Sequence, residues 1–375
     1  MDLFNVYPLY DVTPVSAEGV YITDKSGEKY LDLYGGHAVI SIGHSHPRYV
    51  SALKAQLDKI GFYSNSVKNP LQKTLANKLK ELSGCTDYQL FLCNTGAEAN
   101  ENALKLASFH TGKSAVIAFK NSFHGRTSAA VAATDNPNIW APINQSQEVH
   151  FLELNDIKTF LETIEQKEIC AVIIEAIQGV GGLDEPTTDF YKLVARTCNE
   201  HNIVLIADEV QSGYGRSGRF FGFQHHNIEP DLISMAKGMG NGFPIGGVLI
   251  RNKFKASHGM LGTTFGGNHL ACVAALTVLE VLEQERLIEN AVIMESIFRE
   301  KAAKIAQVRK IKGRGLMLGL EFDFEVADLR KRLIYNQHIF TGSSKDKHVL
   351  RVLPALNITE VEFERFFEAL NEELK

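Results

Sequence analysis

Lys237 occupies a position in this chain that calls for a chemical explanation. It follows an apolar run at 231–235 and opens a glycine-rich loop, GMGNGFPIGG, at 238–247. An ammonium group inside a domain is costly unless it is paired with an acid or loses its proton. Lys237 is therefore either an ordinary surface lysine beside a turn, which is the commoner case, or a lysine held for chemistry.

The predicted strand at 88–93 ends in a second candidate binding feature. Asn94, Thr95 and Gly96 follow it and lead into a predicted helix. Free backbone N–H groups and the positive end of the helix dipole at such a turn can hold a phosphate. The same residues could also form an ordinary helix cap through Asn94 or Thr95.

A third strand end carries an acid. The apolar run at 203–207 leads directly into Asp208 and Glu209, which could also be a helix cap or surface acids. Ligands of an open parallel sheet bind beyond the carboxyl ends of its strands, so these features are expected at one edge. A lysine, an acid for the pyridinium nitrogen and a phosphate anchor are what pyridoxal phosphate requires. Glycines after Lys237 let the backbone pass close to such a cofactor.

The elements that position these residues alternate along the chain. Apolar runs separated by helical stretches lie at 88–93, 114–119, 148–152, 170–175, 203–208, 231–235 and 246–250. Strands that are apolar throughout predict an α/β fold, with a mostly parallel central sheet covered by helices on both faces. The pattern changes after residue 268 to two helices, two strands and a last amphipathic helix. We expect a large α/β domain over 46–269, and a smaller α+β domain formed by 1–45 and 270–375.

Composition narrows the function classes. The 375 residues are 45% hydrophobic and carry a net charge of −5, so the chain lacks the basic character of nucleic-acid-binding proteins. No apolar run is long enough to cross a membrane, and the amino terminus does not resemble a signal peptide. Five scattered cysteines without a CxxC pair predict reduced thiols in a cytoplasmic protein.

The histidines do not predict a metal site. His44 and His46 have suggestive spacing, but no acidic or cysteine partner lies near them in the sequence. We interpret them as part of a structural turn, and we interpret His124 and the pair at 225–226 in the same way.

Five motifs, in order, resemble those of the class-III aminotransferases of fold type I, over residues 10–360. They are the phosphate turn NTGAEANENALKLA, the ring-stacking segment SFHGRT, the aspartate motif IADEVQSGYGRSGRFF, the lysine motif SMAKGMGNGFPIGG and the loop GTTFGGNHLAC. The resemblance implies pyridoxal phosphate as the cofactor and a homodimer with shared active sites.

The resemblance also implies a role for each matching residue at the cofactor. Lys237 is expected to form the Schiff base and then shuttle a proton, and Asp208 to pair with the pyridine nitrogen. The other implied contacts are Gln211 at the ring hydroxyl, Val210 and Phe123 on the two ring faces, the N–H groups of Gly96 and Ala97 at the phosphate, and Thr264 at the phosphate of the other subunit.

Three further residues match positions that hold the substrate. Arg126 and Thr263 match positions for a substrate carboxylate, and Arg351 matches the arginine for the α-carboxylate of glutamate and 2-oxoglutarate. Where the family usually reads QGEGG, this chain has Val180 in place of the glutamate that pairs with that arginine. We therefore expect Arg351 to be paired with another acid or to face water.

The short chain and its HGRT segment most resemble the enzymes of N-acetylornithine and N-succinylornithine. The implied reaction passes the terminal amine to 2-oxoglutarate, giving the acyl-glutamate semialdehyde and glutamate, a step of arginine biosynthesis. An ornithine or 4-aminobutyrate aminotransferase is an alternative, and the residues do not separate acetyl from succinyl.

Two alternatives come from other classes. The literal GxGxxG at 213–218 suggests a nicotinamide-dependent dehydrogenase, but no strand runs straight into its first glycine and no amphipathic helix follows it. No strand ending in an acid lies at the distance that the dinucleotide fingerprint requires. A binding protein that keeps the fold without catalysis is disfavoured, because the lysine and the aspartate are both present.

Overall fold

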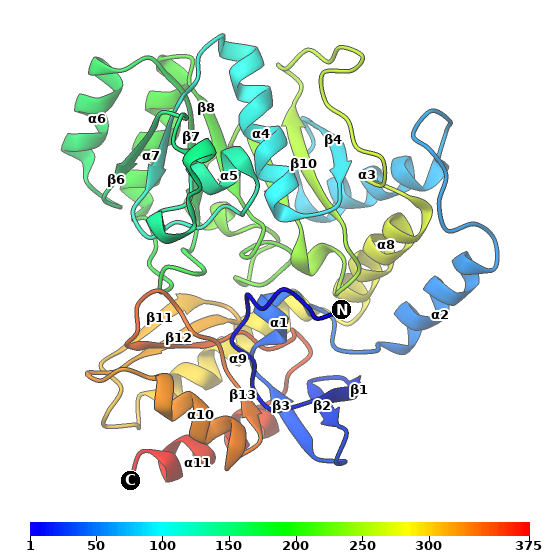
Figure 1. Cartoon of the computed structure of the whole chain (residues 1–375), viewed down its shortest axis with the longest axis vertical. Coiled ribbons are helices and arrows are strands. Elements are labelled where there is room, and N and C mark those ends of the chain that lie inside the picture. The colour runs from blue at the N-terminus through cyan, green and yellow to red at the C-terminus, as the bar shows by residue number, and fades with distance from the viewer.

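A seven-stranded sheet forms the upper part of the molecule in the computed structural model, which describes residues 1–375 (Figure 1). In spatial order its strands are β4 (Tyr88–Cys93), β10 (Gly246–Arg251), β9 (Leu232–Met235), β8 (Val204–Asp208), β7 (Ile169–Glu175), β5 (Ala115–Phe119) and β6 (Val149–Leu152). All seven are strands that the apolar runs predict. Only β10 runs antiparallel to its two neighbours, so the predicted mostly parallel sheet is confirmed.

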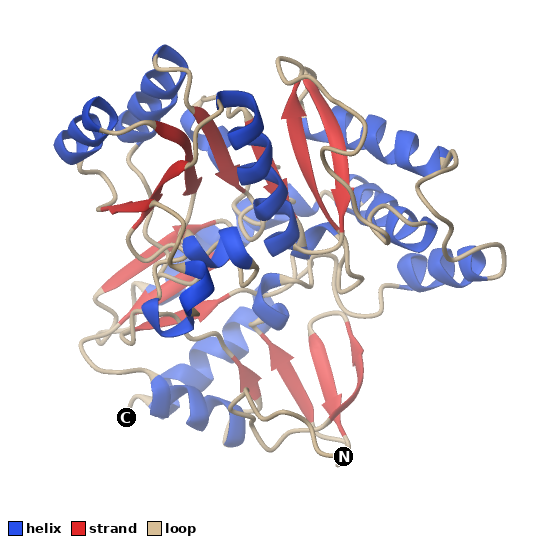
Figure 2. Cartoon of the chain, turned by 45° about the horizontal axis from the view of Figure 1, so that its top comes forward, coloured by secondary structure: helices blue, strands red, loops and turns tan.

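Every residue of β7 and β8 is buried, which explains why these strands are apolar throughout. Alternate residues point to opposite faces. Ile173 packs with residues of the helix α4 (Gly96–Thr111) on one face, whereas Val172 and Ile174 join a larger core with α7 (Thr188–Glu200) on the other. Figure 2 shows helices on both sides of this sheet. The predicted covering of both faces is thus confirmed.

The remaining helices of this part of the chain connect the strands or extend the core beside them. They are α2 (Pro47–Leu57), α3 (Pro70–Ser83), α5 (Ser128–Ala132), α6 (Ile157–Gln166), α8 (His269–Gln284) and the short 3₁₀ helices η1 (Pro137–Ile139), η2 (Pro142–Asn144), η3 (Gly222–His226) and η4 (Lys237–Met239).

Two smaller sheets lie in the lower part of Figure 1. One contains β1 (Pro14–Glu18), β2 (Tyr21–Asp24), β3 (Lys29–Asp32) and β13 (Ile339–Phe340), and the other contains β11 (Lys310–Arg314), β12 (Met317–Glu321) and β14 (Val349–Val352). The helices here are α1 (Gly35–Ala38), α9 (Leu287–Ala302), α10 (Ala327–Tyr335) and α11 (Glu360–Glu373). β3 pairs in parallel with β13, so the amino-terminal segment shares a sheet with the carboxyl-terminal part. The domain boundaries at 45/46 and 269/270 stay a prediction.

None of the helices is both long and apolar enough to cross a membrane. All five cysteines are buried and none forms a disulfide.

Candidate active site

The carboxyl ends of the parallel strands meet at a cavity of about 390 Å³. The residues with an implied contact to cofactor or substrate that line it are Gly96, Ala97, Phe123, Arg126, Asp208, Val210, Gln211 and Lys237. These side chains therefore meet at the carboxyl ends of the strands, as the sequence predicts. Their individual roles stay predictions.

Lys237 begins η4, directly after β9, with a backbone φ of +45°. This left-handed conformation is uncommon for a residue with a Cβ atom and turns the chain sharply at the cavity. Burial lowers the pKa of Lys237 to about 8, although the charges of Asp208 and Glu175 oppose the shift. The amine is thus far easier to deprotonate than that of a surface lysine.

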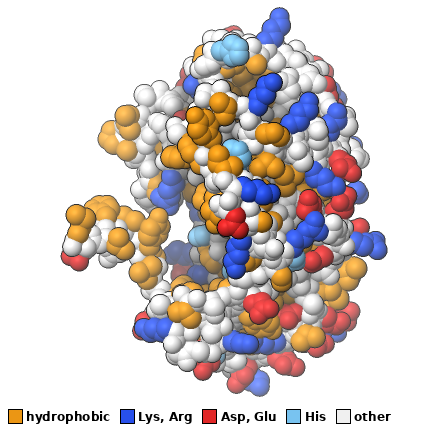
Figure 3. Space-filling view, turned by 90° about the vertical axis from the view of Figure 1, so that its right-hand side faces the viewer, with side chains coloured by type: hydrophobic (Ala, Val, Ile, Leu, Met, Phe, Trp, Pro, Cys, Tyr) orange, Lys and Arg blue, Asp and Glu red, His pale blue; other side chains and the backbone are white.

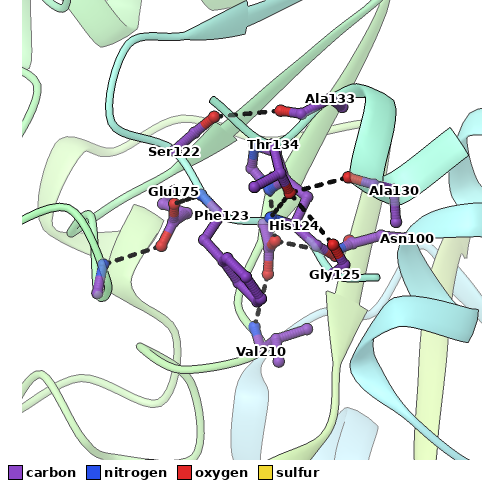
Figure 4. Close-up of polar contacts among 12 residues, drawn as sticks. Asn100, Ser122, Phe123, His124, Gly125, Ala130, Ala133, Thr134, Glu175 and Val210 are labelled. Carbon is purple, nitrogen blue, oxygen red and sulfur yellow. Dashed lines mark hydrogen bonds and ion pairs between the residues drawn. The ribbon is translucent and has the colours of Figure 1, made fainter. Parts of the chain in front are cut away.

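Asp208 ends β8 and is almost completely buried, with 4% of its surface exposed. Its Oδ2 accepts hydrogen bonds from Asn100 Nδ2 at 2.7 Å and from His124 Nδ1 at 2.7 Å. Its Oδ1 accepts the backbone N–H of Val210 at 3.0 Å (Figure 4). These donors fix the carboxylate in one orientation, and an ionised group needs such partners when it is buried.

The structure corrects the interpretation of His124. The sequence placed it in a structural turn, whereas its fully buried ring binds the carboxylate of Asp208. Its backbone N–H donates to Thr134 Oγ1 at 2.9 Å, which fixes the segment after β5. Because Nδ1 faces an acceptor, it carries a proton, and His124 acts by orienting Asp208.

The turn after β4 has the geometry of an anion site. Thr95 Oγ1 accepts the N–H of Glu98 at 3.1 Å, so the chain enters α4 through a side-chain cap. The N–H groups at the start of a helix have no partner within it and point outward. A Cβ atom at Gly96 would lie 2.5 Å from Cγ1 of Val210, so only glycine fits between α4 and the loop after β8.

Gln211 offers an acceptor without a partner. Its Nε2 donates to the backbone carbonyl of His37 at 3.3 Å, whereas its buried Oε1 has no hydrogen bond. Buried polar atoms are nearly always paired, so this oxygen fits a donor such as the hydroxyl of a ligand in the cavity. With the amine, the acid and the anion turn, it satisfies the polar groups of pyridoxal phosphate.

Glu175 is a cavity residue that we did not single out from the sequence. It ends β7 beside Asp208, its register partner on β8. Its Oε1 accepts the N–H of Phe123 at 3.0 Å and its Oε2 the N–H of Gly179 at 2.9 Å. Burial and the charge of Asp208 raise the pKa of Glu175 to about 7, against the effect of His124 and the two N–H groups. The rule that singled out Asp208, an acid at a strand end, also applies to Glu175.

Three residues predicted for the site do not line the cavity. Thr263 accepts a hydrogen bond from Asn94 Nδ2 at 3.0 Å and lies in a neighbouring hollow. Thr264 is exposed on the surface. Arg351, on β14, is buried with 3% of its surface exposed.

The expectation for Arg351 is wrong. Its guanidinium neither pairs with an acid nor faces water. Instead, Nη1 donates to the carbonyl of Gly179 at 2.6 Å, and Nε donates to the carbonyl of Ser343. Backbone carbonyls carry partial negative charge, so they satisfy the donors that the missing glutamate would take.

The other motifs have structural contacts. Glu209 accepts N–H groups of Gly222 and Phe223, both at 2.8 Å, which shapes the chain that follows the GxGxxG. His44 and His46 each contact one acid distant in sequence, Asp32 and Glu285 respectively, and no group of three possible metal ligands forms.

Comparisons with known proteins agree with this geometry. The family model described as aminotransferase class-III matches residues 5–374. The chain is 38% identical to the acetylornithine aminotransferase of Bacillus subtilis, covering 96% of this chain and 94% of the relative. It is also 38% identical to that of Aquifex aeolicus, covering 99% of each. The crystal structure of the ornithine aminotransferase from Toxoplasma gondii is similar, with a TM-score of 0.90 and 27% identity over 98% of this chain and 91% of the other.

Proposed function

This chain belongs to the class-III aminotransferase family, and we propose that it transfers the terminal amino group of N-acetylornithine to 2-oxoglutarate. The observation that carries the proposal is the meeting of Lys237, Asp208 and the anion turn at one cavity. The choice of substrate is supported by the full-length similarity to enzymes named for acetylornithine. The products are N-acetylglutamate semialdehyde and glutamate, which places the reaction in arginine biosynthesis.

Pyridoxal phosphate is the cofactor of this aminotransferase, and when bound it supplies an electron sink and a carrier for the amino group. We assign its phosphate to the N–H groups of Gly96 and Ala97, and its ring to the space between Phe123 and Val210. Gln211 Oε1 would accept the ring hydroxyl. Each of these five residues lines the cavity.

Lys237 and Asp208 supply the chemistry of the chain itself. The ε-amine of Lys237 holds the cofactor and, once released, moves a proton to and from the reacting carbon, a role that suits an amine with a pKa of about 8. Asp208, held by His124 and Asn100, keeps a proton on the pyridine nitrogen.

The substrate carboxylates require cations at different distances from Lys237. Arg126 lines the cavity from an exposed position at its mouth, which suits the distant carboxylate of N-acetylornithine. We assign Arg351, which is buried behind the cavity wall where its Nη1 donates to the carbonyl of Gly179, to the α-carboxylate of glutamate, which sits beside the reacting carbon. A ligand of either kind gains a charge-assisted contact.

We also propose a homodimer in the cytoplasm. The rings of Phe62 and Phe265 lie 5.4 Å apart between centroids, tilted by 50°, while exposing 43% and 60% of their surfaces. Figure 3 shows exposed hydrophobic side chains on this side of the molecule. Thr264 lies beside Phe265, where a second copy would bring it to the other cavity. Five unpaired cysteines fit a reducing compartment.

A competition among amines tests the proposed function. The purified protein with pyridoxal phosphate is assayed with 2-oxoglutarate and, separately, N-acetylornithine, N-succinylornithine, ornithine and 4-aminobutyrate. We expect kcat/KM for N-acetylornithine to exceed that for ornithine by about 10-fold or more, since a site built for the acyl group leaves polar groups unpaired with the free amine. Preference for ornithine or 4-aminobutyrate would instead assign the chain to another branch of the family.

A further inference from the structure

Gly179 connects two charged side chains, that of Glu175 in the cavity wall and that of Arg351 on β14. The N–H of Gly179 donates to Glu175, and its carbonyl accepts from Arg351. The two peptide groups that flank this Cα atom are therefore each fixed by a charged side chain. A Cβ atom at residue 179 would lie 2.0 Å from Oε1 of Gln211, so a larger residue there would displace the side chain of Gln211.

Glu175 joins two backbone segments beside the cavity. One oxygen holds the backbone of Phe123 and the other holds Gly179, as Figure 4 shows for the carboxylate and Phe123. An ionised carboxylate accepts at both oxygens, whereas a carboxamide accepts at one and donates at the other. The arrangement is therefore specific for a glutamate that carries its charge.

Resting on the proposed function, we propose that Glu175 is a positioning residue for glutamate and 2-oxoglutarate. It fixes Gly179, whose carbonyl holds Arg351 in place for the α-carboxylate. Val180 cannot supply an acid to the arginine, so the carbonyl of Gly179 accepts from Arg351 instead, and Glu175 fixes the residue that carries this carbonyl. Burial lowers the pKa of Arg351 to about 10, and the charge of Glu175 is one of those that oppose this shift.

The consequence is a difference between the two half-reactions. Glutamate and 2-oxoglutarate present a carboxylate beside the reacting carbon and depend on the placement of Arg351. N-Acetylornithine presents methylenes there and depends on it far less. Loss of Glu175 should therefore weaken one half-reaction much more than the other.

Glu175→Gln tests this difference, with Glu209→Gln as the matched control. Glu209 is also a buried acid that accepts two backbone N–H groups, and burial raises its pKa to about 7 as well, but it does not line the cavity. We expect Glu175→Gln to raise KM for 2-oxoglutarate by about 10- to 100-fold, the size of one hydrogen bond to a charged group. KM for N-acetylornithine should change by less than about threefold, and Glu209→Gln should affect the two substrates alike.

Binding of glutarate provides a readout without turnover. This dicarboxylate has no amine or keto group to react, and calorimetry measures its Kd. The affinity should fall in Glu175→Gln in proportion to the KM for 2-oxoglutarate and should hold in Glu209→Gln. An equal change of both half-reactions, or unchanged glutarate binding, overturns the proposal.

The wild-type protein supplies a second test that does not depend on a variant folding. Glu175 has a pKa of about 7, so it gains a proton as the pH falls from 8 to 6 and can no longer accept at both oxygens. The charged and titratable groups that face it are Asp208, His124, Lys237 and Arg351. KM for 2-oxoglutarate should rise over this range relative to KM for N-acetylornithine, and the ratio should be flat in Glu175→Gln.

The outcomes separate this proposal from the proposed function. If the wild type rejects both acyl-ornithines but reacts with glutamate, the substrate assignment fails, and the glutarate and glutamate measurements still decide the role of Glu175. A wild-type protein that reacts with neither overturns both.

Discussion

At the scale of single residues, a buried acid and a partly buried lysine define what the cavity can do. Three N–H donors converge on Asp208, and hydrogen bonds to charged groups contribute about 1.5–3 kcal/mol each. Lys237 instead loses hydration without a comparable set of partners, and its amine gives up its proton more readily. Asp208 thus stays ionised in one position, whereas Lys237 can readily lose and regain a proton.

Lys237 should therefore react as an unusual lysine when the cofactor is removed. In trace labelling of the apoprotein with acetic anhydride, its rate should reach half its plateau near pH 8, because only the neutral amine is nucleophilic. Exposed lysines should do so near their ordinary pKa of about 10.4. Peptide mass spectrometry follows each lysine separately.

Asp208→Asn is the informative companion variant. The charge of Asp208 raises the pKa of Lys237, so its removal should move the labelling curve to lower pH. A wild-type curve that coincides with those of the surface lysines would show that Lys237 is hydrated and not desolvated as the structure has it.

The residue types that the sequence could reveal are those with a distinctive place in the chain. Lys237 and Asp208 each follow an apolar strand, so the position alone singled them out. The partners of Arg351 could not be found in this way, because they are backbone carbonyls and every residue has one. His124 was missed because it lies 84 residues from Asp208, and nothing local indicates that the two side chains meet.

At the scale of elements, the continuity of apolar runs predicted all seven strands of the large sheet. The pattern could not predict that β10 runs antiparallel, since a strand buried on both faces is apolar in either direction. The direction matters for the site. β10 begins after the loop that follows Lys237 and pairs with β4. The end of β4 leads into the anion turn, so the antiparallel pairing brings the loop and the turn together.

The helix α4 is the element that makes this turn, and Gly96 sets how closely it approaches Val210. Gly96→Ala should lower the affinity for pyridoxal phosphate by about 10-fold or more, because overpacking a close contact costs about 1–3 kcal/mol. Equilibrium dialysis or the visible absorbance of bound cofactor measures the loss.

Val210→Ala provides the control for that variant. Removing both methyl groups of Val210 clears the space that the Cβ atom added by Gly96→Ala would need, although it also removes the proposed contact with the ring of pyridoxal phosphate. Gly96→Ala should therefore cost less in the Val210→Ala background than in the wild type. Additive effects would mean that Gly96 acts through the helix backbone and not through Val210.

At the scale of the whole molecule, apolar surface is exposed where two segments that are far apart in the sequence meet. Phe62 follows α2 and Phe265 precedes α8, and their tilted rings lie side by side and exposed. Leu3 and Phe4 are more than 90% exposed in the amino-terminal segment, which stands away from the body in Figure 3. Clustered exposed apolar side chains indicate an interface between proteins. The resemblance implied that the loop with Thr264 reaches a partner subunit, and the fold adds Phe62, which no local feature of the sequence connects with that loop.

The proposed second copy of the chain on this surface would account for the exposure of Thr264. We expect the wild type to have twice the mass of the 41.6 kDa chain by light scattering. Phe265→Asp should shift it toward the single-chain mass, because the variant loses an aromatic anchor and buries an unpaired charge, which together cost about 3 kcal/mol or more. Thr264→Ala should keep the double mass yet retain less pyridoxal phosphate, since it removes one hydroxyl and no apolar contact. Together, the two variants distinguish formation of the dimer from the contribution of Thr264 to the partner's cavity. A wild type that stays a single chain while holding its cofactor would refute both, and a dimeric Thr264→Ala with unchanged retention would leave the dimer but exclude Thr264 from the partner's cavity.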